Sequence, residues 1–198
     1  KYGSDLKEGW ADTNVFEPWA GYAVESPSDS GKITFYPIQD TTIAARTTNS
    51  GWRLNLDLSS NSSFDRTSAI GRCDACEENV DMNDMRLLPS LTQRVYISLD
   101  INNDGQFDHS KDLRSTTDFN GVWNMRVNRP NAEGSLTLKG AYENDRPNDL
   151  VLMIVNVSTR EVLKNFPVES FELSNMNSEF NDFKVVAGEE AYVLSMVD

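Results

Sequence analysis

The chain has few of the residues that enzymes use for covalent and acid-base chemistry. Its 198 residues include one histidine, His109, and two cysteines, Cys73 and Cys76. A Ser-His-Asp or Cys-His mechanism would have to use His109, which lies in an acidic segment with no nucleophile motif beside it. The sequence also has no Gly-x-Ser-x-Gly elbow, no His-Glu-x-x-His pair and no phosphate-binding glycine loop. We therefore expect a non-enzymatic protein.

Long apolar runs and positive charge are scarce as well. No run approaches the roughly 18 to 20 apolar residues that a membrane helix needs, so we expect no membrane insertion. The formal net charge is -13, from 18 Lys and Arg against 31 Asp and Glu, and this charge disfavours nucleic acid as a partner. The chain begins at Lys1 without a signal-like segment, which indicates a recombinant fragment, a processed product or an interior piece of a longer protein.

The sequence is instead rich in short strand patterns. Trp52–Leu58 alternates apolar and polar residues, and Leu150–Val157 is a mostly apolar run suited to a central strand buried on both faces. Further strands are predicted around Val95–Leu99, Trp123–Val127, Leu136–Leu138, Phe171–Leu173 and Phe183–Ala187. No stretch of a dozen residues has a helical stripe. These patterns predict an all-β fold, an antiparallel β-sandwich of the immunoglobulin-like or jelly-roll-like kind.

The first fifty residues differ in character from the rest. Residues 22–25 and 32–36 read as two strands joined by a turn, and residues 39–50 are polar enough for a linker. We therefore divide the chain into an N-terminal hairpin segment, 1–48, and a sandwich domain, 49–198. The alternative is that the hairpin joins the main sandwich.

The segment Asp100–Asp112 (DINNDGQFDHSKD) has the spacing of a calcium-binding loop. Side-chain oxygens stand at alternate places, and a glycine at the sixth place permits the sharp turn that brings the seventh carbonyl to the ion. The predicted ligands are Asp100, Asn102, Asp104, Gln106, Asp108 and Asp112. This density of hard oxygen ligands favours calcium, with an affinity on the order of 10⁻⁴ to 10⁻³ M as in extracellular modules.

The back half of this loop departs from the EF-hand pattern. Lys111 stands at the twelfth place, where a bidentate Glu is expected, and Asp112 follows one residue later. Either the loop is one residue longer or Asp112 binds with altered geometry. Because strand patterns flank the loop, we expect it between strands and without paired helices. A metal-free acidic hairpin turn is the alternative, since Asn-Asp-Gly is also a turn signal.

Two other groups of residues offer alternative functions. Asp81 and Asp84, with Asp65, Asp74, Glu77 and Glu78 nearby in the sequence, could be a solvated acidic loop, a second calcium site or the carboxylate pair of a glycosidase. Trp10 and Trp19 lie near turns, where exposed rings could stack on sugars. Trp52 and Trp123 each begin an alternating strand, so we expect both in the core.

Cys73 and Cys76 form a C-x-x-C motif with three possible chemistries. A redox pair needs a βαβ context, which the sequence lacks. A zinc site needs further ligands, which only His109 and a carboxylate could supply. In an oxidising exterior a local disulfide is favoured.

The ordered pattern of several short segments resembles a known family. The segment Glu17–Glu25 (EPWAGYAVE) resembles the "GYWV" hairpin of large secreted bacterial proteins of the type IX secretion system. The following segments resemble the next β-sandwich of those proteins: Gly51–Leu54, Ala69–Gly71, Asp74–Ala75, Asp81 and Asp84 ahead of Pro89, Asp112–Arg114, Trp123–Val127, Leu136–Leu138 and Phe183–Gly188. The pattern departs from the family at the C-x-x-C motif and at Ala23, where the hairpin usually has an aromatic residue.

The resemblance implies an accessory module that precedes the C-terminal sorting domain of a secreted or cell-surface protein. Together with the calcium loop it predicts a calcium-stabilised structural or adhesive module, with calcium, a cell-surface glycan or neighbouring domains of the parent protein as partners. Two alternatives stay open: a carbohydrate-binding module attached to a secreted hydrolase, and a small hydrolase that uses the acidic loop residues.

Overall fold

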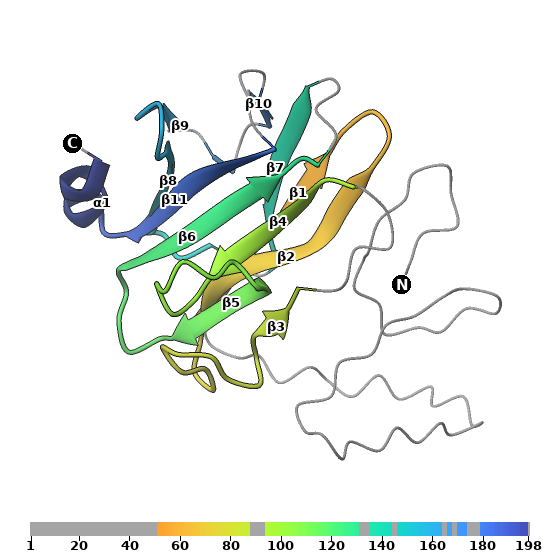
Figure 1. The fold of residues 1–198 in the computed structure, drawn as a ribbon. Coiled ribbons are helices and arrows are strands. Elements are labelled where there is room, and N and C mark those ends of the chain that lie inside the picture. Colours follow the sequence, from red (N-terminus) through yellow and green to blue (C-terminus); the bar gives the residue numbers. More distant parts are fainter. Residues whose placement is uncertain are drawn as a thin grey trace, which may run out of the picture.

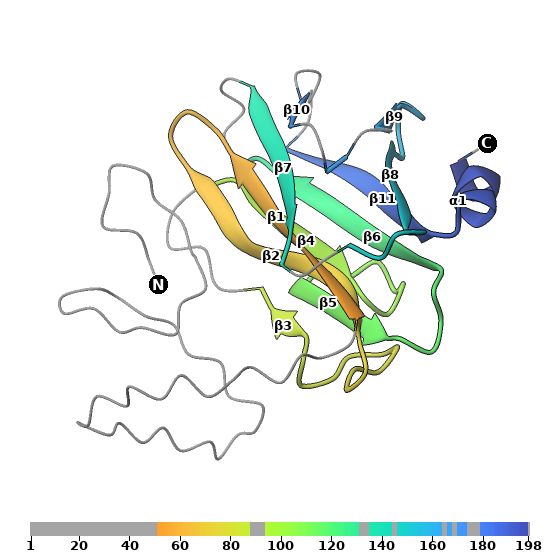
Figure 2. The same cartoon turned by 180° about the vertical axis from the view of Figure 1, so that it is seen from behind.

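The computed structural model describes residues 51–87, 94–130, 135–143, 146–163, 166–167, 170–173 and 179–197. The predicted N-terminal hairpin and the boundary near residue 48 lie outside these residues. Figures 1 and 2 show the strands β1 (Gly51–Ser59), β2 (Phe64–Cys73), β3 (Met85–Arg86), β4 (Tyr96–Asp100), β5 (His109–Ser115), β6 (Gly121–Asn128), β7 (Leu136–Tyr142), β8 (Val151–Asn156), β9 (Val162–Leu163), β10 (Phe171–Leu173) and β11 (Phe180–Gly188), followed by the helix α1 (Glu190–Val197).

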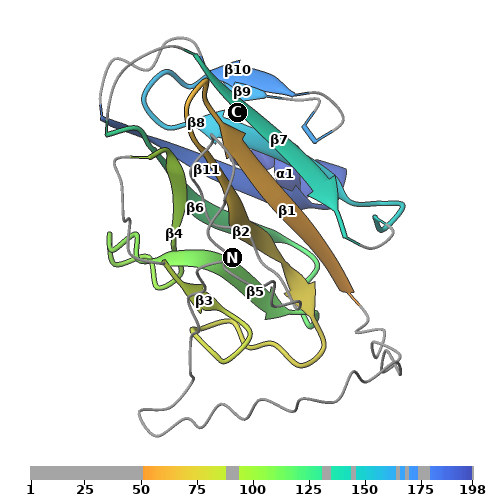
Figure 3. The ribbon, with the colours of Figure 1, turned by 90° about the vertical axis from the view of Figure 1, so that its right-hand side faces the viewer.

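The eleven strands of the described part belong to one sheet. Ten follow the order β10-β7-β1-β2-β5-β4-β6-β11-β8-β9, and β3 pairs with β5 beside this path. The sheet is mixed and curls strongly into a half-barrel, which Figure 3 shows from the side. The prediction of a mostly β chain is therefore confirmed.

The antiparallel prediction is wrong at one pairing. β2 and β5 run parallel, with Ala69 opposite Lys111 and Cys73 opposite Ser115. The chain can make this crossover because the connection from β2 to β5 is long enough to include β3 and β4. The described strands also form one continuous sheet where two packed sheets were expected. Curling brings the inner faces of the two arms together, and this satisfies the same alternating pattern that predicted a sandwich.

The core lies on the concave side of the curl. β1 from Trp52 onward and the whole of β6 alternate buried and half-buried residues, as their sequences predict. Trp52 and Trp123 are buried and meet edge to face, with ring centroids 5.6 Å apart. The expectation that these two rings fill the core is confirmed.

β2 is buried on both faces, as are the last four residues of β4, whereas β8 is not. Every residue from Thr67 to Cys73 is buried, although the strand contains polar and charged side chains. In β8, by contrast, Val151 and Met153 are only half-buried, because β8 lies next to the edge strand β9. The apolar run of β8 was therefore misleading, and the polar residues of β2 are buried because they have partners, described below.

The helix α1 was not expected from the sequence. It follows β11 directly and lies beside β8 and β11 (Figure 2), and its Val193 is fully buried. The amide of Glu189 donates a hydrogen bond of 2.9 Å to the side-chain carbonyl of Asn120, which ties the start of the helix to the β5–β6 loop. Among the residues that the structure describes, no helix has the length and apolar character needed to cross a membrane.

Candidate functional site

The predicted calcium loop connects β4 to β5 and is organised around the carboxylate of Asp100. Asp100 is the last residue of β4 and is only 4% exposed. Its two carboxylate oxygens accept hydrogen bonds from the amides of Asp104, at 3.2 Å, and Gly105, at 3.0 Å. These bonds bring Asp104 and Gly105, the fifth and sixth residues of the loop, close to Asp100, the first. The spacing in the sequence predicts a turn of this kind.

The backbone of the loop explains the need for Asn and Gly in the middle. Asn103 and Gly105 have positive φ angles of 56° and 82°. Both residue types adopt this left-handed region more readily than others, and glycine does so without a steric penalty. The amide of Gln106 donates to the carboxylate of Asp104 at 2.9 Å, which closes a second small turn inside the first.

Two of the six predicted ligands have other partners. Asp108 lies with one carboxylate oxygen 2.7 Å from Nδ1 of the buried His109. Asp112 lies within β5, is 1% exposed and forms an ion pair of 2.8 Å with Arg114. Burial raises the pKa of the Asp112 carboxyl, and the hydrogen bond and the charge of Arg114 lower it. Either residue would have to release its partner to bind calcium directly.

The fit of the loop to calcium is therefore partial. Asp100, Asn102 and Asp104 would supply side-chain oxygens, Gln106 would supply its carbonyl, and water would complete the shell, as calcium accepts. In the described residues, no three His, Cys, Asp or Glu side chains stand close enough together to hold a metal ion. Binding would thus require the side chains of this loop to rearrange around Asp100.

The acidic loop between β2 and β3 uses its carboxylates to hold its own backbone. Asp81 accepts hydrogen bonds from the amides of Glu77, at 2.7 Å, and Asn83, at 2.5 Å. Asp84 accepts from the amide of Asp81, at 2.9 Å, and from the amide of Leu113 in β5, at 2.8 Å. The loop is therefore folded by these two side chains.

Asp84 has the most clearly perturbed carboxyl in this loop. Burial, the largest cause, and the negative charges of Asp112 and Asp81 together raise the pKa of Asp84 to about 6, although the two amide hydrogen bonds lower it. Such a pKa suits a catalytic acid, but the two oxygens of this carboxyl already accept bonds from the chain. Asp65, which the sequence grouped with this loop, lies at the opposite end of β2.

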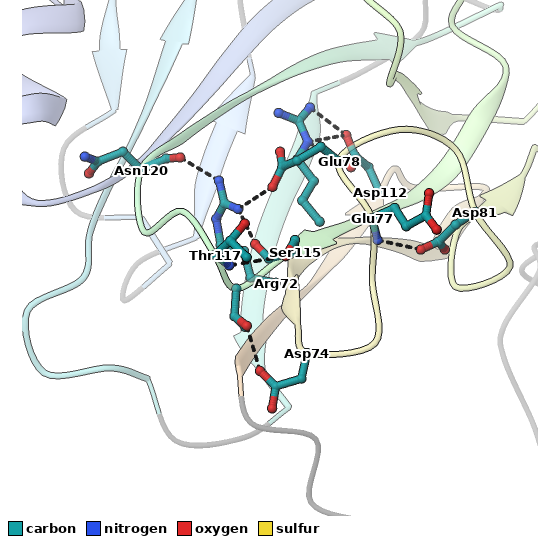
Figure 4. A network of polar contacts seen from close by, with 11 residues as sticks. Arg72, Asp74, Glu77, Glu78, Asp81, Asp112, Ser115, Thr117 and Asn120 are labelled. Carbon is teal, nitrogen blue, oxygen red and sulfur yellow. Dashed lines mark hydrogen bonds and ion pairs between the residues drawn. The ribbon is translucent and has the colours of Figure 1, made fainter.

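The base of the acidic loop is tied to its neighbours by Arg72 (Figure 4). Its buried guanidinium pairs with Glu78 at 2.9 Å and donates to the carbonyl oxygens of Ser115 and Asn120. The group also lies 5.7 Å from the ring centroid of Trp123. Arg72 thus joins the ends of β2, β5 and β6, which explains why a cation is buried in the central strand.

Cys73 and Cys76 are paired as a disulfide at the point where β2 enters the acidic loop. Their Cα atoms are 5.3 Å apart, and the amide of Cys76 donates to the carbonyl oxygen of Cys73 at 3.2 Å. Both side chains are buried. The pair therefore closes a tight turn at the base of the loop. Trp10 and Trp19, the candidate sugar-binding rings, lie outside the described residues.

Two contacts of the β4–β5 loop with the sheet were not foreseen from the sequence. The side-chain amide of Asn124 donates to the side-chain oxygen of Asn103 at 2.6 Å, and the Arg126 guanidinium lies 4.0 Å from the ring centroid of Phe107. The only sequence signal was that Asn124 and Arg126 alternate with buried residues of β6, which places them on the outer face of the sheet.

Comparisons with known proteins identify no relative: no family model, no curated protein and no solved structure matches the chain.

Proposed function

We propose that this chain is a non-catalytic, structural or adhesive β module that calcium stabilises at the β4–β5 loop. The observation on which the proposal depends is the buried carboxylate of Asp100, which already gathers the amides of the fifth and sixth loop residues around itself. Burying a carboxylate is costly, and a bound calcium ion would offset part of that cost.

The non-catalytic part of the proposal depends on how the acidic side chains are used. Asp81, Asp84 and Asp112 accept hydrogen bonds from backbone amides or from an arginine, so each contributes to the fold. Asp65 is 3% exposed and accepts from Thr67, Ser68 and the amide of Ile97. A glycosidase needs two carboxyl groups that face a substrate, and these residues instead face their own chain.

The setting of the module is part of the same proposal. A disulfide at Cys73–Cys76 and a calcium loop of weak affinity both suit the oxidising, calcium-rich exterior of a cell. We further propose a secreted or cell-surface parent protein of the type IX secretion kind, and a sandwich-like packing of the two arms of the sheet. Neighbouring domains of the parent or a surface glycan would be the partners.

Thermal melting in calcium and in chelator tests the proposal. With calcium at ten times the dissociation constant, the folded state gains about 1.4 kcal/mol, and this raises the melting temperature by a few degrees. The double variant Asp100→Asn, Asp104→Asn should lose the shift. The matched control is Asp118→Asn, Asp149→Asn, which removes the same charge from two exposed positions and should keep the shift.

Two results would contradict the calcium site. One is an equal midpoint in calcium and in chelator for the unchanged chain. The other is a calcium-dependent shift of the same size in the Asp100, Asp104 double variant. Turnover of a polysaccharide or peptide that a single acidic substitution abolishes would contradict the non-catalytic part.

A further inference from the structure

Met82 is the most exposed large apolar side chain among the residues that the structure describes, with 80% of its surface accessible. It belongs to the β2–β3 loop, which extends beyond the end of the sheet (Figures 1 and 3). A side chain this exposed contributes little to packing. What the loop presents to solvent at this position is therefore a thioether, a soft and polarisable sulfur that oxidants can reach.

No thiol competes with the methionines for an oxidant. Free thiolates react with peroxides faster than thioethers do, so an exposed cysteine would be oxidised first. The only two cysteines of the chain, Cys73 and Cys76, are joined as a disulfide, and both are buried. Mild oxidation of sulfur in the folded chain therefore falls on its methionines.

The five methionines that the structure describes differ widely in exposure. Met125 lies in the core and is fully buried, and Met82 is at the other extreme. Between them are the half-buried Met85 and Met153, and Met196 of α1, which is 48% exposed. This range sets an order of reactivity, because an oxidant reaches a buried sulfur only when the fold opens.

The fold of the loop is maintained by residues other than Met82. Its neighbours Asp81 and Asn83 hold the backbone: Asp81 accepts from the amides of Glu77 and Asn83, at 2.7 and 2.5 Å. The side-chain amide of Asn83 donates to the carbonyl oxygen of Ala75 at 2.9 Å. A chemical change at the Met82 sulfur therefore leaves the contacts that shape the loop intact.

We propose that Met82 is a modification site, at which peroxide oxidises the folded chain first and at which the fold tolerates the added oxygen. The sulfur lone pair attacks one oxygen of hydrogen peroxide, the S–O bond forms and the O–O bond breaks. The proton of the transferred oxygen passes to the leaving oxygen, which departs as water. The sulfur loses two electrons and the peroxide gains them, so the products are methionine sulfoxide and water.

Two properties of the site favour this step. Solvent surrounds the sulfur, and water relays the proton and stabilises the charges that separate as the O–O bond breaks. Hydrogen peroxide is uncharged, so the carboxylates of the loop do not repel it as they would an anionic oxidant. The product is a polar side chain on an exposed loop, whereas the same change at Met125 would place a polar group in the core.

A time course with hydrogen peroxide tests the inference on the intact chain, in chelator, followed by peptide mass mapping of each methionine. Met82 should be oxidised about twofold faster than Met196, in proportion to their exposed fractions, and on the order of a hundredfold faster than Met125. In concentrated urea the rates should converge, because the fold then shields none of the sulfurs. The rate at Met176, which lies outside the described residues, does not enter the comparison.

Met82→Leu and the matched control Met196→Leu assign the first oxidation, since leucine conserves the side-chain volume and has no sulfur. Met82→Leu should abolish oxidation of this loop and leave the rates at the other methionines unchanged, and Met196→Leu should leave the rate at Met82 unchanged. The chain oxidised at Met82 alone should melt within about 2 °C of the unoxidised chain, as expected for a change at an exposed position.

Either part of the inference can fail separately. Faster oxidation of any other described methionine in the folded chain would show that Met82 is not the first site. A larger drop in melting temperature on oxidation of Met82 would show that the fold does not tolerate the sulfoxide. Neither result bears on the calcium site, because the inference does not depend on it.

Discussion

Asp84 should make this protein less stable as pH rises through about 6. Its carboxyl has a folded pKa of about 6 against an ordinary value of 3.8, because it is partly buried beside Asp112 and Asp81. The folded state therefore holds a proton that the unfolded state releases between these two values. The stabilisation is complete below about pH 4 and is lost as pH rises through 6.

The size of this effect on the free energy of unfolding follows from the shift of the Asp84 pKa. A rise of the Asp84 pKa from 3.8 to about 6 corresponds to a free energy of about 3 kcal/mol as an upper limit, at about 1.36 kcal/mol for each pKa unit. Solvent reaches part of this carboxyl, and screening reduces the effect, so we expect about 1 to 2 kcal/mol. Asp84→Asn keeps an oxygen for the amide of Leu113 and has no proton to lose. The variant should therefore gain stability relative to the unchanged chain as pH rises from 4.5 to 7.5.

Urea unfolding at a series of pH values measures this difference. All samples contain a chelator, so that a cation near Asp112 and Asp84 cannot substitute for the proton. Asp118→Asn, an exposed position, is the control and should leave the pH dependence of the unchanged chain intact. The reasoning fails if the free-energy difference between the Asp84→Asn variant and the unchanged chain is constant between pH 4.5 and 7.5.

Substitutions at three other places test the fold. Asp65→Ala removes the acceptor of the Ile97 amide and leaves buried donors unpaired, so urea unfolding should report a loss of about 3 kcal/mol or more, whereas Asp65→Asn should lose less. Replacing Cys73 and Cys76 by serine should lower the free energy of unfolding by about 2 kcal/mol at most, since the ring that the disulfide closes is small. Two free thiols, detected in the intact mass of unreduced protein, would show that the disulfide does not form in solution. Gly71→Ala should prevent normal folding, because its Cβ would lie 2.2 Å from a backbone oxygen of β1; a native-like circular dichroism spectrum and melting temperature would contradict this.

The sequence predicted the strands whose two faces differ. β1 and β6 alternate apolar and polar residues, and this period of two places the apolar residues on the buried face of each strand. It also predicted the turn around Asp100, because Gly105 at the sixth place of that loop permits a sharp turn, and Gly105 does have a positive φ angle. Local chemistry was sufficient in these cases, since each feature is decided by residues close in the chain.

Only the tertiary structure decided the features that depend on residues far apart in the chain. β2 has a polar sequence and is buried, because Asp65 finds the amide of Ile97 and Arg72 finds the carbonyl oxygens of Ser115 and Asn120. The residue pattern of β2 by itself cannot predict those partners. The same holds for the parallel pairing of β2 with β5, which joins residues about forty positions apart, such as Ala69 and Lys111. Periodicity records which face of a strand is apolar, whereas pairing and charge compensation depend on where the folded chain brings each strand.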